Sequence, residues 1–274
     1  MGRKSAVTGR NLVYTLALDP AGATGHRNLA KMLVSSLLRT RFSGDILVFH
    51  NSPAPLFMVA RHGVREVKMK VPAKAGKNGS FVAYAQSCKH AVAAHIDAKK
   101  YDRVMFIDCD SVVLRNIDHL LAGDWDLAVF PEQNTDIHEY CWGGYTTRRE
   151  KKHLVREGLN SGTWAVTGAR FHELLRRWRA VEARKMTRVG LREQSAFNRV
   201  ALDWDGTVES WPHRAIALPL VAANLVCYHD YSQAAIVHAA SGAPVDYKSR
   251  FLFGIFAGTF LFDTQLLLLN TLEM

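Results

Sequence analysis

The feature that most constrains the fold is an apolar run, Val104 to Ile107, that ends in two carboxylates one residue apart, Asp108 and Asp110. A short apolar run of this kind is typical of a buried strand, and a second one, Val112 to Leu114, follows. Open α/β sheets bind their ligands at the carboxyl ends of the strands. Paired carboxylates there suit Mg²⁺ or Mn²⁺ holding a diphosphate, because such ions take both carboxylate and phosphate oxygens.

Strand and helix patterns alternate along the rest of the chain, which predicts an α/β fold with a mostly parallel, Rossmann-like sheet and helices on both faces. No repeat or shift in composition marks a linker, so we expect one domain over residues 1–250 and an apolar tail over residues 251–274. Strands are expected over Leu12–Leu18, Asp45–His50, Val64–Val71, Arg103–Ile107, Asp126–Phe130, Trp164–Thr167 and Ala235–His238. Helices are expected over Asn28–Arg39, Phe81–Ala98, Phe171–Arg184 and Gln194–Ala201.

Net charge and cysteine content limit which binding partners and which cellular compartment we expect. The 274 residues carry a formal net charge of +10, which attracts nucleic acid, anionic membranes or phosphorylated substrates. Zinc-finger spacing and an aromatic RNA-binding signature are both missing, so no nucleic-acid partner is expected. The four cysteines form no Cys-x-x-Cys pair, which argues against zinc and for a reducing compartment. The basic N-terminus lacks an apolar signal core, and we expect a cytoplasmic protein.

The tail from Phe251 to Leu269 is very apolar and holds one charge, Asp263. Such a segment needs a partner surface. We expect it to pack on the domain or to form a subunit contact, as in a homodimer. Peripheral membrane contact is the alternative, favoured by Lys248 and Arg250 just before it, and a membrane span is the least favoured reading.

Further polar segments follow the same order as in a known family. Lys89 sits on the helix before the Asp-x-Asp strand, Asn160-Ser161-Gly162 reads as a turn entering a strand, Glu193-Gln194 opens a helix, and His238 ends a strand. With Leu12–Leu16 and Tyr101–Leu121, these pieces resemble the glycogenin-like, family 8 glycosyltransferases of the GT-A fold. The resemblance runs over roughly Leu12 to Gly242.

The resemblance implies a metal site and a catalytic pair. Asp110 is then a direct metal ligand, Asp108 reaches the ion or the ribose, and His238 is the third ligand. An imidazole ligand suits Mn²⁺ better than Mg²⁺. Glu193 and Gln194 match the family's Asp-Gln pair beside the anomeric carbon, and Gln194 would stabilise the positive charge there.

The resemblance also implies how the donor is held. Thr15, Leu16 and Asp19 fall where the family grips the nucleotide, and Lys89 where a basic residue contacts the sugar nucleotide. The segment of Asn160, Ser161 and Gly162 would face the donor sugar, with Gly162 permitting close approach of the backbone.

Two departures from the family pattern affect these assignments. The acid of the catalytic pair is Glu193 instead of Asp, one methylene longer. The family's late His is followed by Gly and then Lys-Pro-Trp, whereas here the next lysine after His238 is Lys248. Lys248 or Arg250 would then take the place of the lysine that binds the diphosphate.

The expected function is a metal-dependent glycosyltransferase that moves a sugar from a nucleotide-diphosphate donor, a UDP-sugar, to a hydroxyl acceptor with retention of configuration. One alternative is a nucleotidyltransferase, whose glycine-rich basic loop would be Asp19–Arg27. The other is an inactive module that binds sugar nucleotides or a membrane surface, which the missing Lys-Pro-Trp and the apolar tail favour.

Overall fold

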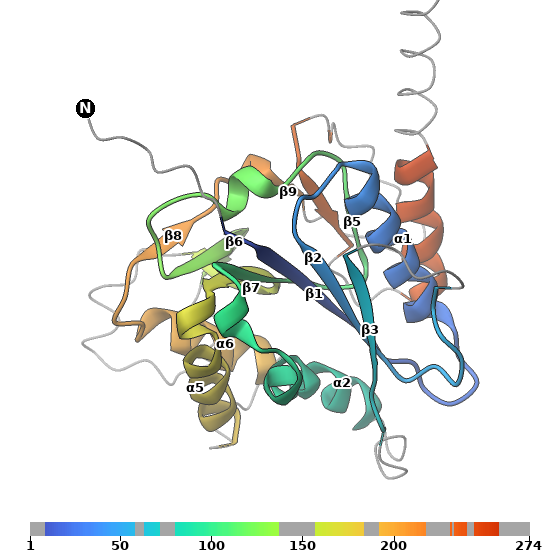
Figure 1. Ribbon diagram of the computed structural model, residues 1–274, viewed down its shortest axis with the longest axis horizontal. Coiled ribbons are helices and arrows are strands. Elements are labelled where there is room, and N and C mark those ends of the chain that lie inside the picture. The colour runs from blue at the N-terminus through green and yellow to red at the C-terminus, as the bar shows by residue number, and fades with distance from the viewer. Residues whose placement is uncertain are drawn as a thin grey trace, which may run out of the picture.

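The computed structural model describes residues 9–57, 63–71, 80–136, 157–183, 192–217, 231, 233–239 and 244–257. Within these ranges the chain forms an α/β fold with a seven-stranded, mostly parallel central sheet, a three-stranded second sheet and helices around them (Figure 1). Each helix in the described part is too short or too polar to cross a bilayer.

The elements of the central sheet and its helices follow in chain order. The strands are β1 (Asn11–Ala17), β2 (Asp45–His50), β3 (Val64–Lys68), β4 (Arg103–Ile107), β6 (Leu127–Asp136), β7 (Glu157–Thr167) and β8 (Val208–Ser210). The second sheet holds β5 (Ser111–Val113), β9 (Ile216–Ala217) and β10 (Ile236–His238). The α-helices are α1 (Gly25–Arg39), α2 (Ser80–Ala91), α5 (Phe171–Ala183) and α6 (Arg192–Leu202). Short 3₁₀ turns are η2 (Val92–His95), η3 (Ala98–Lys100), η4 (Asp118–Leu121), η5 (Gly168–Arg170) and η6 (His213–Ala215).

The strands of the central sheet lie in the order β3-β2-β1-β4-β7-β6-β8. The connections from β1 lead first to one side of it and later to the other. The chain runs outward from β1 through β2 to β3, then returns to place β4 on the other side of β1, and these four strands are parallel. β7 is antiparallel to both β4 and β6. The carboxyl ends of β1 and β4 therefore meet at a topological switch point, where open α/β sheets bind ligands.

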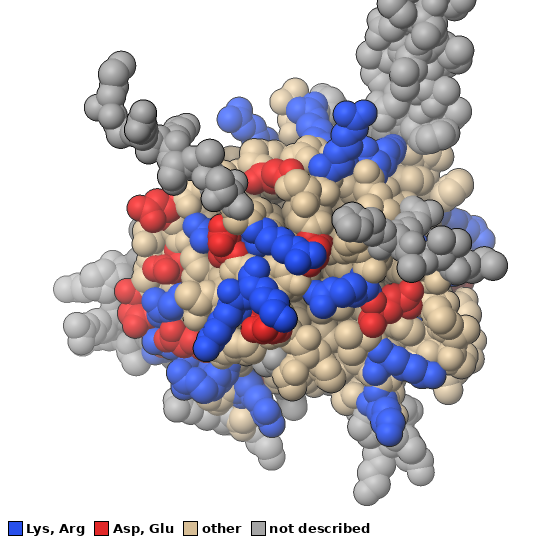
Figure 2. Space-filling view, viewed as in Figure 1, with Lys and Arg blue, Asp and Glu red and all other residues tan. Residues whose placement is uncertain are grey.

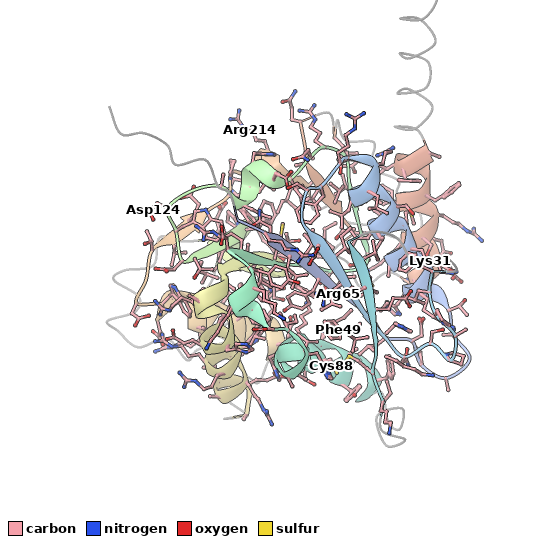
Figure 3. The ribbon with its side chains drawn as sticks, viewed as in Figure 1. Lys31, Phe49, Arg65, Cys88, Asp124 and Arg214 are labelled. Carbon is pink, nitrogen blue, oxygen red and sulfur yellow. The ribbon has the colours of Figure 1, made fainter. Side chains whose placement is uncertain are left out.

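Alternating side chains of the strands build one hydrophobic cluster on each face of the sheet. Leu12 and Tyr14 of β1 join the cluster under α2, α5 and α6, as do Phe49 of β2 and Cys88 of α2 (Figure 3). Val13, between them, joins the cluster under α1 and the second sheet. Period-2 alternation of this kind is what a sheet covered on both faces requires. The prediction of helices on both faces is confirmed.

Each expected strand and helix has a counterpart, and several differ in extent. β3 ends at Lys68 instead of Val71, and α1 begins at Gly25 instead of Asn28. β2 and β4 have the predicted bounds. The helix expected over Phe81–Ala98 ends at Ala91, followed by the 3₁₀ turn η2. β6 and β7 are longer than expected, and β7 contains the Asn160–Gly162 segment that reads as a turn in the sequence.

The segment after Asn160 is an irregularity inside β7. Val129 of β6 pairs with Trp164, whereas the next residue, Phe130, pairs with Asn160, so three residues of β7 are extra at this point. Such a bulge re-aims side chains and is common beside binding sites. The polar residues predicted a turn because Asn, Ser and Gly favour turns, but pairing with β4 and β6 keeps the segment in the sheet.

The described part of the tail packs on the domain. Residues 245–257 form a helix, the red helix beside α1 in Figure 1. Leu252 is fully buried, and Phe251 and Phe256 pack against the cluster under α1. The guanidinium of Arg39 lies 4.8 Å from the centre of the Phe256 ring. The prediction of packing on the domain is confirmed for residues 251–257, and residues 258–274 lie outside the described ranges.

Charged side chains cover the surface (Figure 2), and the two described thiols lie inside the protein. Figure 2 shows Lys and Arg side chains over much of one face, with carboxylates between them. Several are paired, for example Arg10 with Asp45 at 2.7 Å. Cys88 and Cys109 are free and buried. Cys141 and Cys227 lie outside the described ranges.

We predict that Asn198→Ala destabilises the fold by about 2–4 kcal/mol. The buried amide of Asn198 accepts from the Leu159 N–H at 2.7 Å and donates at 2.8 Å to the carbonyls of Leu159 and Gln194, which ties α6 to β7. Its loss leaves buried backbone groups without partners. Urea unfolding measures the change. Asn116→Ala is the control, because its exposed amide makes four hydrogen bonds that water can replace, and equal losses for both variants would contradict the prediction.

Candidate metal centre

The candidate site lies at the switch point between β1 and β4. Asp108 follows the last residue of β4, and its amide N–H donates to the Gly162 carbonyl of β7 at 2.7 Å. Asp110 comes two residues later, immediately before β5. β4 is buried up to Ile107, whereas Asp108 and Asp110 are half-buried, so the two acids leave the core where the strand ends.

The second sheet brings His238 to these acids across a long stretch of sequence. β10 pairs antiparallel with β5, which places His238 opposite Ser111, and the Ala239 N–H donates to the Asp110 carbonyl at 2.9 Å. The His238 Nε2 atom lies 3.2 Å from Asp110 Oδ1 and 3.7 Å from Asp108 Oδ2. Backbone pairing therefore fixes the imidazole against both carboxylates.

Asp108, Asp110 and His238 form a group that could hold a metal ion. One potential ligand atom from each lies within 4.8 Å of the others. Two carboxylates and one imidazole are a donor set that suits Mn²⁺, and the oxygens also suit Mg²⁺. The predicted metal ligands are thus brought together, although the sequence places His238 far from the two acids.

Two ammonium groups face these carboxylates. The Lys248 Nζ atom lies 2.6 Å from Asp110 Oδ2. The Lys89 Nζ atom, from α2, lies 3.2 Å from Asp108 Oδ2 and 2.8 Å from Glu193 Oε1. Three carboxylates, those of Asp108, Asp110 and Glu193, therefore share two ammonium groups, and a further cation would be attracted to the excess negative charge.

For Asp108, Asp110 and Lys89, burial shifts the pKa in one direction and the charged partners shift it in the other. Burial raises the pKa of Asp108, although Lys89 opposes the shift. Burial would also raise the pKa of Asp110, but His238 and Lys248 outweigh it and lower the pKa. For Lys89, burial would lower the pKa, but the charges of Asp108 and Glu193 outweigh it and raise the pKa. The lysine is held as a cation inside the protein.

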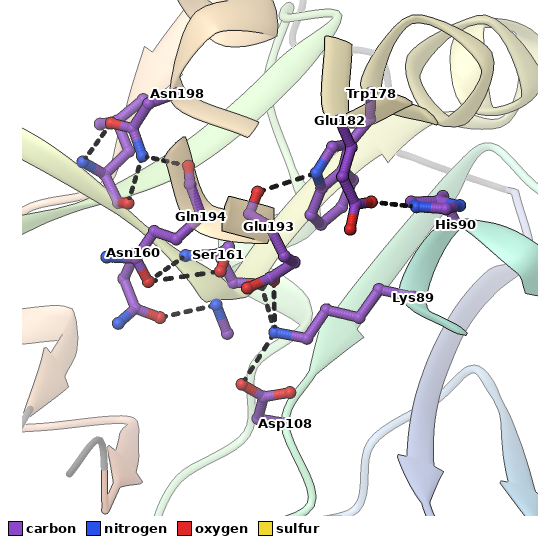
Figure 4. A network of polar contacts seen from close by, with 12 residues as sticks. Lys89, His90, Asp108, Asn160, Ser161, Trp178, Glu182, Glu193, Gln194 and Asn198 are labelled. Carbon is purple, nitrogen blue, oxygen red and sulfur yellow. Dashed lines mark hydrogen bonds and ion pairs between the residues drawn. The ribbon is translucent and has the colours of Figure 1, made fainter. Parts of the chain in front are cut away.

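A polar network on the other side of Lys89 connects β7 to α6 (Figure 4). The Ser161 hydroxyl donates to Gln194 Oε1 at 3.3 Å, and the Ser161 carbonyl accepts from Lys89 at 3.4 Å. Asn160 Oδ1 accepts from the Gly162 N–H at 2.7 Å. The backbone carbonyl of Glu193 accepts from the Trp178 indole at 2.9 Å. The predicted acid-amide pair and the Asn-Ser-Gly segment are therefore in direct contact.

Glu132 is a member of this network that the sequence reading missed. Its buried Oε1 atom accepts from Asn160 Nδ2 at 2.5 Å and from Gln194 Nε2 at 3.4 Å. The missed signal is its position, two residues beyond the predicted strand end at Phe130, because β6 continues where the sequence pattern suggested a stop. Glu132 holds the two amides in fixed orientations.

The residues predicted to grip the nucleotide divide into two groups. Thr15 and Leu16 lie near the carboxyl end of β1, where they pair with β2, and the buried Thr15 hydroxyl has no hydrogen-bond partner among the described residues. Asp19 instead binds its own loop, accepting from His26 and Arg27 at 2.9–3.2 Å. Burial would raise the pKa of Asp19, but these hydrogen bonds, those of His26 first, outweigh it and lower the pKa. Asp19 therefore organises the entry to α1.

Comparison with protein-family models finds no match to this chain, and comparison with curated proteins finds none either. What the site can do must therefore follow from its own residues.

We predict that Gly162→Ala weakens the binding of Mn²⁺ by at least about tenfold, because the added methyl group has no room. A Cβ there would lie 2.3 Å from His238 Cε1 and 2.6 Å from Asp108 Oδ2. Titration calorimetry with Mn²⁺ measures the effect. Gly254→Ala is the control, since nothing lies within 4 Å of its Cβ position. Unchanged Mn²⁺ affinity in Gly162→Ala would contradict the prediction that Mn²⁺ binds beside Gly162.

Proposed function

We propose that the protein is a metal-dependent glycosyltransferase of the GT-A type, similar to the glycogenin-like family, using a nucleotide-diphosphate sugar, a UDP-sugar, and a hydroxyl acceptor. The observation that carries the proposal is one cluster at the switch point of the sheet. It combines the Asp108, Asp110 and His238 group, two lysines, and the Glu193-Gln194 pair. A diphosphate donor needs cations for its phosphates and polar groups near its sugar, and this cluster supplies both.

A pocket of about 520 Å³, lined by the loop after β1, has room for part of such a donor. It lies between the loop from Asp19 to Gly25 and the first turns of the helix over residues 245–257. Asp246 and Ser249 line it, and Lys248, between them in sequence, reaches Asp110. The helix that lines this pocket therefore also supplies the lysine that contacts Asp110.

The chain's own residues suggest the division of roles. A divalent cation held by Asp108, Asp110 and His238 would act as Lewis acid toward the leaving diphosphate. The ammonium groups of Lys89 and Lys248 add fixed positive charge where negative charge builds. The Gln194 amide, held between Ser161 and Glu132, presents a neutral dipole near the sugar.

Glu193 is better suited to positioning than to nucleophilic attack. Its carboxylate is buried and pairs with the Lys89 ammonium at 2.8 Å, and such a partner lowers its nucleophilicity. We therefore propose that Glu193 holds Lys89 in place and that retention proceeds through a short-lived ion pair stabilised by Gln194, without a covalent intermediate on Glu193.

The nucleotidyltransferase alternative is less well supported by the loop after β1. In that reading Arg27 would bind phosphate, but its guanidinium already donates to Asp19 at 3.1 Å, to the Ser52 hydroxyl at 3.1 Å and to the Ala23 carbonyl at 2.5 Å. A side chain with three internal acceptors has little capacity left for a ligand.

The test of function is release of UDP from a panel of UDP-sugars with Mn²⁺, with and without hydroxyl acceptors. We expect Mn²⁺-dependent release that Asp110→Asn lowers by at least about 100-fold, because the variant loses a charged ligand. Asp97→Asn, at an exposed carboxylate, is the control and should keep full activity. Nucleotide-sugar binding without release, in the presence of acceptors, would favour the inactive binding module, and release of pyrophosphate from a nucleoside triphosphate would favour the nucleotidyltransferase.

We predict that Lys248→Ala has opposite effects on the two ligands. Without nucleotide, Mn²⁺ should bind several-fold more tightly, because a competing cation 2.6 Å from Asp110 is gone. With Mn²⁺ present, UDP should bind about tenfold more weakly, because a charge-assisted hydrogen bond to phosphate is lost. Calorimetry of both ligands measures this. Lys100→Ala, an exposed lysine, is the control. Losses of the same sign for both ligands would contradict the role given to Lys248.

A further inference from the structure

The helix over residues 245–257 leaves aromatic side chains exposed, and Phe253 is the most exposed of them. Leu252 is fully buried, but its neighbour Phe253 is 63% exposed. Beside Phe253, a hollow of about 440 Å³ opens between this helix and α1. Its lining is mainly apolar, with Met32 from α1 and Phe253 and Phe256 from the helix, and Lys31 and Arg250 also border it. We call these five residues the Phe253 surface.

The charge around the Phe253 surface is almost wholly positive. α1 contains no acidic residue, and the helix over residues 245–257 contains only Asp246. Arg27 and Lys248 turn inward, to Asp19 and Asp110. Lys31 and Arg250 are exposed, and neither forms an ion pair within the described part of the chain. Figure 3 shows Lys31 on α1 beside this helix. An exposed aromatic ring is thus flanked by two cations free to meet an anionic partner.

We propose that the Phe253 surface docks on an anionic lipid membrane as a peripheral contact. Phe253 would enter the boundary between headgroups and acyl chains, while Lys31 and Arg250 would meet the anionic headgroups. Charge complementarity favours lipid over a second copy of the chain. In a two-fold contact the same surface faces itself, which would bring Lys31 and Arg250 of both copies together.

The sequence beyond the helix agrees with this surface. It continues with Phe260-Leu261-Phe262 and with four leucines, Leu266 to Leu269, and holds a single charge, Asp263, between them. The hollow also shares Asn28, Ser249 and Arg250 with the pocket of about 520 Å³ at the loop from Asp19 to Gly25. Docking would therefore bring that pocket close to the membrane. The proposal does not rest on the proposed enzymatic function, because its test needs no activity.

The test is co-sedimentation of the full chain with vesicles of phosphatidylcholine alone and with vesicles containing about 30% phosphatidylserine. We expect binding to the anionic vesicles that weakens as salt is raised. Phe253→Asp should lower the partition coefficient at least about tenfold, because a carboxylate replaces the inserted ring. The double variant Lys31→Glu with Arg250→Glu should lower it by at least about tenfold and remove the preference for phosphatidylserine.

Two control variants distinguish binding through the Phe253 surface from non-specific binding to vesicles. Tyr247→Ser removes a 42% exposed aromatic ring of the same helix that does not border the hollow, and Arg214→Glu reverses an exposed charge far from Lys31 in Figure 3. Both should bind vesicles like the unaltered chain. The proposal is overturned if the unaltered chain does not bind anionic vesicles. It is also overturned if Phe253→Asp and the Lys31→Glu, Arg250→Glu double variant bind them as well as the controls do. A dimer in sizing experiments that only these variants dissociate, without vesicle binding, would also overturn it in favour of a second copy.

Discussion

The buried ammonium of Lys89 is the contact on which the candidate site depends. It joins the end of β4, through Asp108, to the start of α6, through Glu193, and it also contacts the β7 backbone at Ser161. Breaking a buried ion pair by removing one partner costs about 3–5 kcal/mol, because the remaining charge loses its compensation. Two carboxylates pair with this one cation, so a neutral side chain in place of Lys89 would leave both without that compensating charge. The architecture of the site follows from where α2 places this lysine.

Much of the fold can be predicted from the sequence, because local patterns and buried strands carry strong signals. The alternation of Leu12, Val13 and Tyr14 between two apolar clusters makes β1 recognisable as a strand covered on both faces. The antiparallel direction of β7 could not be predicted this way, since β7 is buried on both faces as a parallel strand would be, and burial does not depend on strand direction. The bulge after Asn160 was missed for a related reason. Local turn preference and sheet pairing conflict there, and only the register with β6 resolves the conflict.

The residues of the candidate metal centre could be predicted more easily than the groups that surround them. Asp108 and Asp110 stand out because carboxylates rarely end an apolar run without a partner. His238 was predicted only through a resemblance, since its closeness to Asp110 depends on pairing between β5 and β10, which are far apart in sequence. Glu132 gave no signal, because its importance comes from two amides on other elements. Long-range pairing therefore decides which polar residues share a site, and sequence spacing alone does not contain that information.

The helix over residues 245–257 has two different sides. One contacts the candidate site and the core, and the other exposes Phe253. Its inward side carries Lys248 to Asp110 and buries Leu252, so the same helix supplies a cation to the site and apolar area to the core. The chain thus places a lysine beside Asp110, although no Lys-Pro-Trp segment follows His238 in its sequence. Because the inward side is committed in this way, Phe253 is left on the outward side, next to Arg250. A ligand that draws Lys248 away from Asp110 would loosen one of the contacts that orient the helix. Occupancy of the site and presentation of the Phe253 surface are therefore expected to be coupled through this one element.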